Sequence, residues 1–126
     1  MSTGIYVIES KNYAGYIYGS EKSDKWQQFL RNKKYDIINP IKQNNYHINF
    51  LGNNLKKDYS YFKSYIVYGD NSTLKVNYKN PYVKVIKNEN LIEELIYDIH
   101  NSKICITNEE IDKLYIDLNY FRKHSR

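Results

Sequence analysis

Short runs of β-branched and aromatic residues, separated by turn residues, constrain the fold of this chain most strongly. Residues 4–8 and 15–19 are two such runs, with turn-forming residues at 10–12 between them. This pattern predicts an N-terminal β-hairpin. The chain therefore begins with two strands that we expect to pair with each other.

The same pattern returns in the middle of the chain. Residues 59–68 and 73–78 are strand-like runs on either side of Gly69-Asp70-Asn71, and the second run alternates apolar with polar side chains. A further strand is expected at 82–86. Pro81 comes just before it, and because proline cannot donate to a strand ladder, we expect a break between strands or a sheet edge there.

The region between these strands is harder to interpret. From Ser23 onward, Trp26, Phe29 and Leu30 lie at helical spacing behind a serine that can cap a helix, so we predict one short helix. Residues 33–58 contain asparagine, proline and lysine pairs that are typical of turns and solvated surface. We expect one strand within them, at 46–51.

The C-terminal part has the clearest helical pattern. Asn90 can cap a helix in which Leu91, Leu95 and Ile99 share one face. A second capping pattern at Thr107 opens another predicted helix, whose apolar stripe consists of Ile111, Leu114, Leu118 and Phe121. We expect both helices to pack on the sheet.

These elements predict a single α+β domain spanning residues 1–126, with a small antiparallel or mixed sheet and two to three helices packed on it. The side chains expected to be buried are Trp26, Phe29, Leu95, Ile99, Leu114 and Leu118. Cys105 is alone, so an intramolecular disulfide is impossible. Because the sequence has neither a long apolar stretch nor a signal-peptide pattern, we expect a cytoplasmic protein that does not enter a membrane. The oligomeric state stays open.

The net charge of +5 is unevenly distributed. Residues 31–87 carry 11 basic and 3 acidic residues, whereas residues 88–126 carry 5 basic and 8 acidic ones. This asymmetry favours nucleic acid or an acidic protein surface as a partner. The alternative is that lysine merely serves as a solubilising residue in an Asn-, Lys- and Tyr-rich composition. The lysines predicted to bind nucleic acid are Lys33, Lys34, Lys56, Lys57, Lys63, Lys75 and Lys84.

The first thirty residues resemble a known family. Gly4-Ile5-Tyr6 is followed after about ten residues by Tyr16-Ile17-Tyr18-Gly19, and then by Ser20 and the start of a predicted lysine-bearing helix, which resembles the opening of a GIY-YIG nuclease domain. The resemblance implies that Tyr6 and either Tyr16 or Tyr18 lie on adjacent strands and activate a water molecule. It implies that an arginine steadies the phosphate and that Glu94, in the helix at 90–100, binds a divalent metal ion such as Mg²⁺.

Arg31 stands one helical turn later than the arginine of that family, so we predict that the chain does not cleave DNA. No cofactor is then expected, and a divalent metal ion only in an active enzyme. The leading hypothesis is a small nucleic-acid-binding protein related to GIY-YIG domains without their activity. The alternative is a virus- or phage-encoded protein that binds and inhibits a host or defence protein, and a third possibility is a metal-dependent endonuclease.

Overall fold

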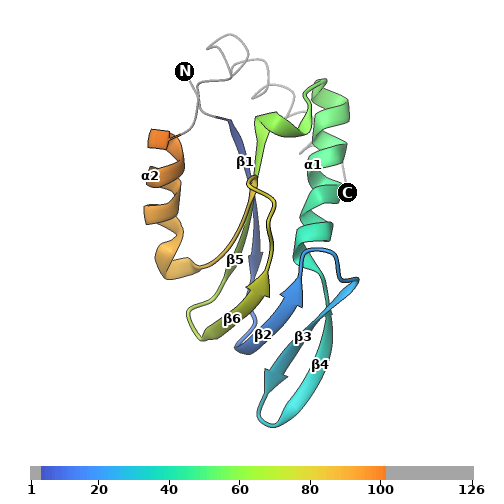
Figure 1. Ribbon diagram of the computed structural model, residues 1–126, viewed down its shortest axis with the longest axis vertical. Helices are drawn as coiled ribbons and strands as arrows, with labels where there is room; N and C mark the ends of the chain where they lie inside the picture. Colours follow the sequence, from blue (N-terminus) through green and yellow to red (C-terminus); the bar gives the residue numbers. More distant parts are fainter. Residues whose placement is uncertain (1–3, 102–126) are drawn as a thin grey trace.

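The computed structural model describes residues 4–101 and shows an α+β fold, as predicted (Figure 1). The strands and helices of this part are β1 (Ile5–Lys11), β2 (Gly15–Ser20), β3 (Lys25–Leu30), β4 (Lys33–Ile38), α1 (Pro40–Leu55), β5 (Phe62–Tyr68), β6 (Ser72–Asn77), β7 (Val83–Lys87) and α2 (Leu91–Asn101). Two 3₁₀ turns, Tyr59–Tyr61 and Asn88–Asn90, precede β5 and α2. None of the helices in this range is long and apolar enough to cross a membrane.

The strands form two sheets. The first contains only parallel pairs and has the order β1-β5-β7. The second has the order β4-β3-β2-β6, with antiparallel pairs except for the parallel pair of β2 and β6. Helix α1 contacts β1 and β5, and polar contacts join α2 to β5 and β7. Figure 1 shows the two helices on either side of the parallel strands.

The predicted N-terminal hairpin is wrong, although both of its strands exist. β1 pairs with β5, whereas β2 pairs with β3 and β6 in the other sheet. The β5–β6 turn explains the difference: the Gly69 amide donates to the Lys11 carbonyl at 3.2 Å, and the Gly15 amide donates to the Asn71 carbonyl at 3.1 Å. Two stretches of chain therefore pass side by side from the first sheet into the second.

Strand β6 and strand β7 follow the predicted ranges closely. They lie in different sheets, so the break expected at Pro81 is confirmed. We expected the strands at 4–8, 15–18, 73–78 and 82–86 to belong to one sheet, and this prediction is wrong, because the first and last lie in one sheet and the other two in the second.

The helix predicted after Ser23 is wrong, because this segment is strand β3. Trp26 is fully buried, as predicted, and its indole Nε1 donates to the Ser20 carbonyl at 2.9 Å. A Cβ at Gly19 would lie 2.3 Å from the indole ring, so only glycine leaves room for it. Phe29 is 41% exposed, so its predicted burial is also wrong. Pairing with strands on both sides overrides the local helical spacing.

Residues 46–51, predicted as a strand, lie within α1. Asn39 caps this helix, since its side-chain oxygen accepts from the backbone amides of Ile41 and Lys42, and Pro40 occupies the first turn. The buried positions recur with helical spacing at Pro40, Ile41, Asn44, Ile48, Gly52 and Leu55.

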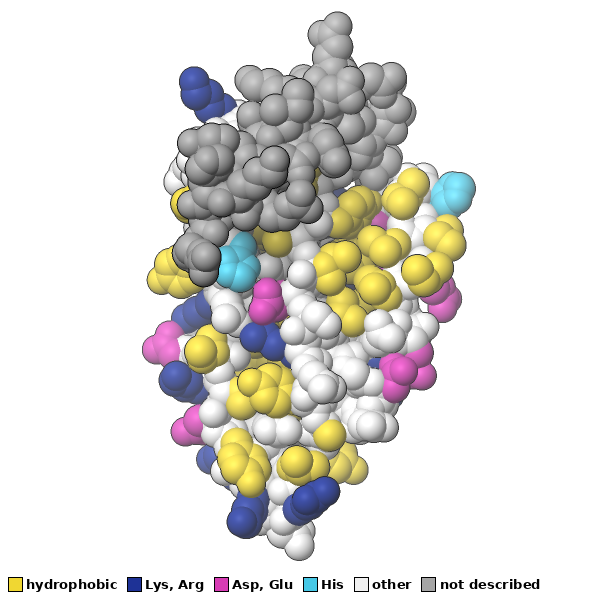
Figure 2. All heavy atoms as spheres, turned by 180° about the vertical axis from the view of Figure 1, so that it is seen from behind, with side chains coloured by type: hydrophobic (Ala, Val, Ile, Leu, Met, Phe, Trp, Pro, Cys, Tyr) yellow, Lys and Arg dark blue, Asp and Glu magenta, His cyan; other side chains and the backbone are white. Residues whose placement is uncertain are grey.

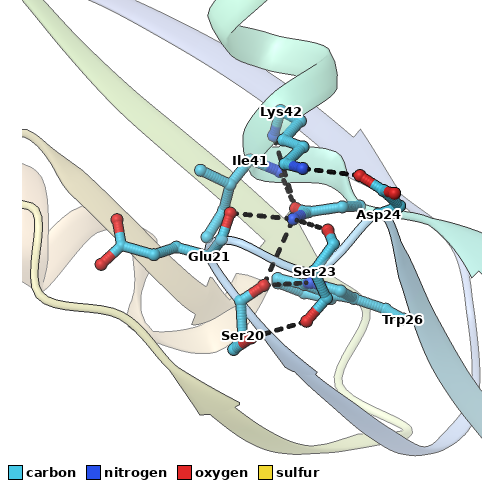
Figure 3. Close-up of polar contacts among 8 residues, drawn as sticks. Ser20, Glu21, Ser23, Asp24, Trp26, Ile41 and Lys42 are labelled. Atoms are coloured by element: carbon cyan, nitrogen blue, oxygen red, sulfur yellow. Dashed lines mark hydrogen bonds and ion pairs between the residues drawn. The ribbon is translucent and has the colours of Figure 1, made fainter.

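Asn39 also ties α1 to the β2–β3 turn. Figure 3 shows the labelled residues of this turn beside Ile41 and Lys42 at the start of α1. Its fully buried side-chain amide nitrogen lies 3.2, 3.0 and 2.7 Å from the carbonyl oxygens of Ser20, Glu21 and Ser23. Because one side chain satisfies both the helix terminus and the turn, it holds the start of α1 against the four-stranded sheet. The core beside it consists of Ile17, Trp26, Ile41, Ile66, Tyr68, Val83 and Val85.

Helix α2 is confirmed, but its predicted burial is not. Leu95 is half-buried and Ile99 is 51% exposed. The contacts of α2 with the sheet include polar ones: Lys84 Nζ lies 2.5 Å from Glu94 and 3.2 Å from Asp98, and the Tyr65 hydroxyl donates to Asp98. The predictions for Cys105, Leu114, Leu118 and the helix from Thr107 lie outside the described residues.

Candidate functional site

Four polar side chains converge near the C-terminal end of β1, between this strand and α1. Lys11 Nζ donates to Gln43 Oε1 at 2.7 Å and lies 3.4 Å from Glu9 Oε1. The other carboxylate oxygen of Glu9 lies 3.8 Å from His47 Nδ1. We call these four residues the Glu9 cluster. Figure 2 shows acidic, basic and histidine side chains close together on the α1 side of the molecule.

Local structure explains why the four side chains meet. Glu9 and Lys11 are two residues apart on a strand and therefore point to the same face. Gln43 and His47 are four residues apart on a helix and also share a face. Between them, the buried Asn44 side chain donates to the Val7 carbonyl at 3.0 Å and to Ser64 Oγ at 2.8 Å, which holds α1 against β1 and β5.

The cluster is partly shielded from water. The side chain of Lys11 is 17% exposed, that of Glu9 is 23% exposed, and that of His47 is the most open of the three. Partial burial strengthens electrostatic interactions relative to those at the free surface. The carboxylate, the ammonium group and the imidazole would therefore interact more strongly with a charged ligand than the same groups at the free surface.

A hollow of about 390 Å³ lies beside the cluster, at the C-terminal edge of the parallel strands. Lys11, Asn12, Gly69 and Asp70 line it, together with Tyr68. The Tyr68 hydroxyl is buried without a hydrogen-bond partner among the described residues, and burial raises the pKa of this phenol, which keeps it a neutral donor. Ligands of sheets with parallel strands bind at this edge.

The described residues do not supply a complete metal site. Glu9 and His47 are possible ligands, but residues 4–101 contain no group of three or more side chains that could hold a metal ion. Magnesium needs several oxygen ligands in octahedral geometry. Lys11, by contrast, supplies a cation suited to a phosphate group.

The structure does not bring the residues of the GIY-YIG resemblance together. Tyr6 lies on the face of β1 opposite Glu9 and packs edge-on against Tyr65, with ring centroids 5.6 Å apart. Tyr16 and Tyr18 lie on β2 in the other sheet. Arg31 is exposed in the β3–β4 turn, where its φ is 52°.

Glu94, the predicted metal ligand, is paired with Lys84. Burial alone would lower the pKa of Lys84, but its hydrogen bonds to Glu94 and Asp98 outweigh burial and raise the pKa. The carboxylate of Glu94 is thus already partnered by a cation. Its role as a metal ligand stays a prediction.

The lysines predicted to bind nucleic acid belong to several parts of the fold. Lys33 and Lys34 begin β4, while Lys56 and Lys57 follow the last turn of α1. In three cases the ammonium group is already in contact with other side chains: Lys57 lies 4.7 Å from the Tyr61 ring, Lys63 lies 5.3 Å from the Tyr82 ring, and Lys84 pairs with α2. Lys75 is exposed on β6.

Sequence reasoning missed the Glu9 cluster. Two sequence patterns could have indicated it: Glu9 and Lys11 are two residues apart beside a predicted strand, and Gln43 and His47 are four residues apart, as on one face of a helix. Since residues 33–58 were not predicted as a helix, the second of these patterns could not be used.

Comparison with known proteins identifies the family of the chain. A family model described as "Nuclease-related domain" matches residues 1–69, which is more than half of the 126 residues. The chain belongs to the nuclease-related domain family. The matched range contains all four residues of the Glu9 cluster. The predicted nuclease relationship is therefore confirmed at this level, and a specific GIY-YIG assignment stays a prediction.

One relative of this nuclease-related domain is an uncharacterized protein from Bacillus anthracis. It is 52% identical over 46 residues, which make up 36% of this chain and 22% of that protein. The match thus spans about a fifth of the relative. No solved structure matches the chain significantly.

Proposed function

We propose that this nuclease-related domain binds nucleic acid through its phosphate backbone, with Lys11 as the central phosphate contact. The observation that carries the proposal is the convergence of Glu9, Lys11, Gln43 and His47 at the C-terminal edge of the parallel strands, within the range that the family model matches. Contacts to phosphate carry no base information, so binding is weakly dependent on sequence.

The geometry of Lys11 supports this role. An ammonium group has three donors, and Gln43 accepts one of them at 2.7 Å, while the Glu9 carboxylate lies further away at 3.4 Å. A phosphate oxygen can therefore be bound while Gln43 keeps the lysine in place. Asn12 offers a neutral donor along the same hollow.

We further propose that the chain by itself does not hydrolyse the bound strand. Phosphoryl transfer requires positioned positive charge, often Mg²⁺ held by one or two carboxylates together with the substrate phosphates. The single carboxylate of the Glu9 cluster already lies 3.4 Å from Lys11 and 3.8 Å from His47.

Hydrolysis at the Glu9 cluster is the second candidate, favoured by the carboxylate and the ammonium group on one face of β1. In that case Glu9 would accept a proton from the attacking water, and Lys11 would stabilise the charge that develops on the phosphate. A GIY-YIG mechanism has less support, because it needs Tyr6 beside Tyr16 or Tyr18, and these residues lie in separate sheets.

The substitution Glu9→Gln separates binding from hydrolysis. If the cluster only binds phosphate, losing this negative charge should strengthen binding to a fluorescein-labelled duplex, by roughly 2- to 10-fold at low salt. Lys11→Ala should weaken the same binding. Lys42→Ala is the matched control, because Lys42 lies on α1 and pairs with the exposed Asp24 outside the cluster.

The same proteins are incubated with single- and double-stranded DNA and RNA in Mg²⁺ or Mn²⁺. We expect intact substrate with the wild-type chain. Cleavage that Glu9→Gln abolishes would contradict the binding-only proposal and establish the second candidate. Cleavage that instead depends on Tyr6 and Glu94 would point to the GIY-YIG mechanism.

A further inference from the structure

We infer that the open face of the four-stranded sheet binds a single-stranded segment of nucleic acid by stacking its bases on Tyr16, Tyr18 and Phe29. This inference deepens the proposed function and rests on it. It concerns a different sheet from the one that carries the Glu9 cluster, so the two can be tested separately.

Strand register places the three aromatic residues on one face. Tyr16 is directly opposite Phe29 on β3, and Tyr18 is opposite Gln27. On the other side of β2, Tyr16 pairs with Thr73 and Tyr18 with Lys75 of β6. Directly opposite residues point to the same side of a sheet, so these side chains form two neighbouring rows across it.

The aromatic rings are accessible on this face. Tyr16 is 51% exposed and Tyr18 is 41% exposed, as is Phe29. The rings of Tyr16 and Tyr18 are 6.4 Å apart and inclined by only 24°, whereas Phe29 meets Tyr18 edge-on at 5.3 Å. Together with Gln27 they line a shallow hollow of about 460 Å³.

The opposite face of the same strands is different. Ile17 and Trp26, which alternate with the exposed aromatic residues, are fully buried in the core. The sheet thus has one packed face and one open face. None of the three aromatic side chains of the open face belongs to the core cluster.

The charges on the open face favour a polyanion over a neutral apolar partner. Lys34 is directly opposite Phe29, Lys75 is opposite Tyr18, and Lys25 lies two residues before Gln27 on β3. The acidic residue of these rows, Asp36, accepts a hydrogen bond from Gln27 at 3.1 Å. Lysines beside stacked aromatic rings are the combination by which single-stranded nucleic acids are bound, with bases on the rings and phosphates at the lysines.

The test uses the full chain and fluorescein-labelled oligothymidylate and oligouridylate, each about 12 nucleotides long. Tyr16→Ala, Tyr18→Ala and Phe29→Ala should each weaken binding roughly 5- to 100-fold. Tyr35→Ala is the matched control. Tyr35 lies on β4 in the same sheet and is 45% exposed, but it is opposite Gln28, a residue of the packed face. This control should bind like the wild-type chain.

The wild-type chain should also prefer the oligonucleotides to a duplex of equal length, because paired bases cannot stack on the rings. Circular dichroism confirms that each variant is folded, and Tyr16→Phe, which keeps the ring, should retain binding.

Three outcomes would overturn this inference. The first is unchanged affinity in all three alanine variants while binding stays sensitive to Lys11→Ala, which would leave the proposed function intact. Absence of nucleic-acid binding in the wild-type chain would overturn both. Loss of a homodimer in the alanine variants, measured by ultracentrifugation, would show that a second copy covers the face and would also overturn the inference.

Discussion

Single residues determine how the parts of this domain meet, and Asn39 is the clearest case. Its oxygen caps α1, while its nitrogen lies within 3.2 Å of three backbone carbonyl oxygens of the β2–β3 turn. A buried amide that serves both segments acts as a strong positional constraint, because no water can replace it at a fully buried site. The placement of Gln43 and His47 depends on the helix that begins here.

Asn39→Ala should lower the free energy of unfolding by about 2 to 4 kcal/mol, because the helix cap is lost and buried carbonyls lose their donor. Asn39→Asp keeps the cap oxygen but replaces the donor by an acceptor, and we expect a loss of at least about 2 kcal/mol. The exposed Asn54, whose side chain bonds only within α1 at the Phe50 carbonyl, provides the control Asn54→Ala, with a change within about 0.5 kcal/mol. Urea denaturation measures all three, and wild-type stability in Asn39→Asp would show that the carbonyl contacts contribute nothing.

Whole elements differ in how well the sequence predicts them. The alternation in β6 and the apolar stripe of α2 are local patterns, and both elements formed as predicted. The local sequence around Trp26 and Phe29 is compatible with a helix or a strand. The segment forms a strand because it pairs with β2 and β4, and a local pattern contains no information on this pairing. The start of α1 could have been predicted, since Asn-Pro at 39–40 is also a capping signal.

The candidate site was also predictable only where it depends on local sequence patterns. Glu9 and Lys11 could be paired from the sequence, because strand alternation places them on one face. Their meeting with Gln43 and His47 could not, because it requires α1 to pack across β1 through Asn44. The aromatic rows of the second sheet likewise depend on the parallel pairing of β2 with β6, which the predicted hairpin does not contain.

Two buried tyrosines of β5 make stability depend on alkaline pH. Burial and the nearby Asp98 raise the pKa of Tyr65, and burial raises that of Tyr68, so the folded state keeps protons that the unfolded state loses near pH 10. The raised pKa of Lys84 acts in the same direction. Because the unfolded state then binds fewer protons, these groups should leave the free energy of unfolding unchanged below about pH 9 and lower it as the pH rises above about 10.

Tyr65→Phe should make the fall of the free energy of unfolding with rising pH shallower, because the variant lacks the Tyr65 hydroxyl, whose pKa is raised in the folded state. The control Tyr46→Phe changes a tyrosine that is largely exposed on α1, and its decline should match that of the wild-type chain. Urea titrations between about pH 8 and 11 measure the slope. An identical slope in Tyr65→Phe and the wild-type chain would contradict the assignment of this proton to Tyr65.

At the scale of the whole molecule, the basic residues within the described range 4–101 do not form a single continuous surface. Several of the predicted lysines contact rings or carboxylates, whereas Lys11 lies in the Glu9 cluster and Lys25, Lys34 and Lys75 lie on the open sheet face. The two surfaces belong to different sheets, which the paired crossing of β1–β2 and β5–β6 connects. A nucleic-acid strand that reaches both would contact phosphates at one and bases at the other.

The salt dependence of affinity tests the central claim, phosphate-backbone binding through Lys11, most directly. The full chain is titrated into labelled single- and double-stranded nucleic acid by fluorescence anisotropy at salt concentrations from about 50 to 200 mM. We predict that the logarithm of the affinity falls linearly with the logarithm of the salt concentration. Lys11→Ala should reduce the steepness of this slope by roughly 0.7 to 0.9, which is the contribution of one phosphate contact, whereas Lys42→Ala should leave the slope unchanged. No binding at the lowest salt, or an affinity that does not change with salt, would contradict the claim, and salt-insensitive capture of a protein partner would favour the inhibitor alternative instead.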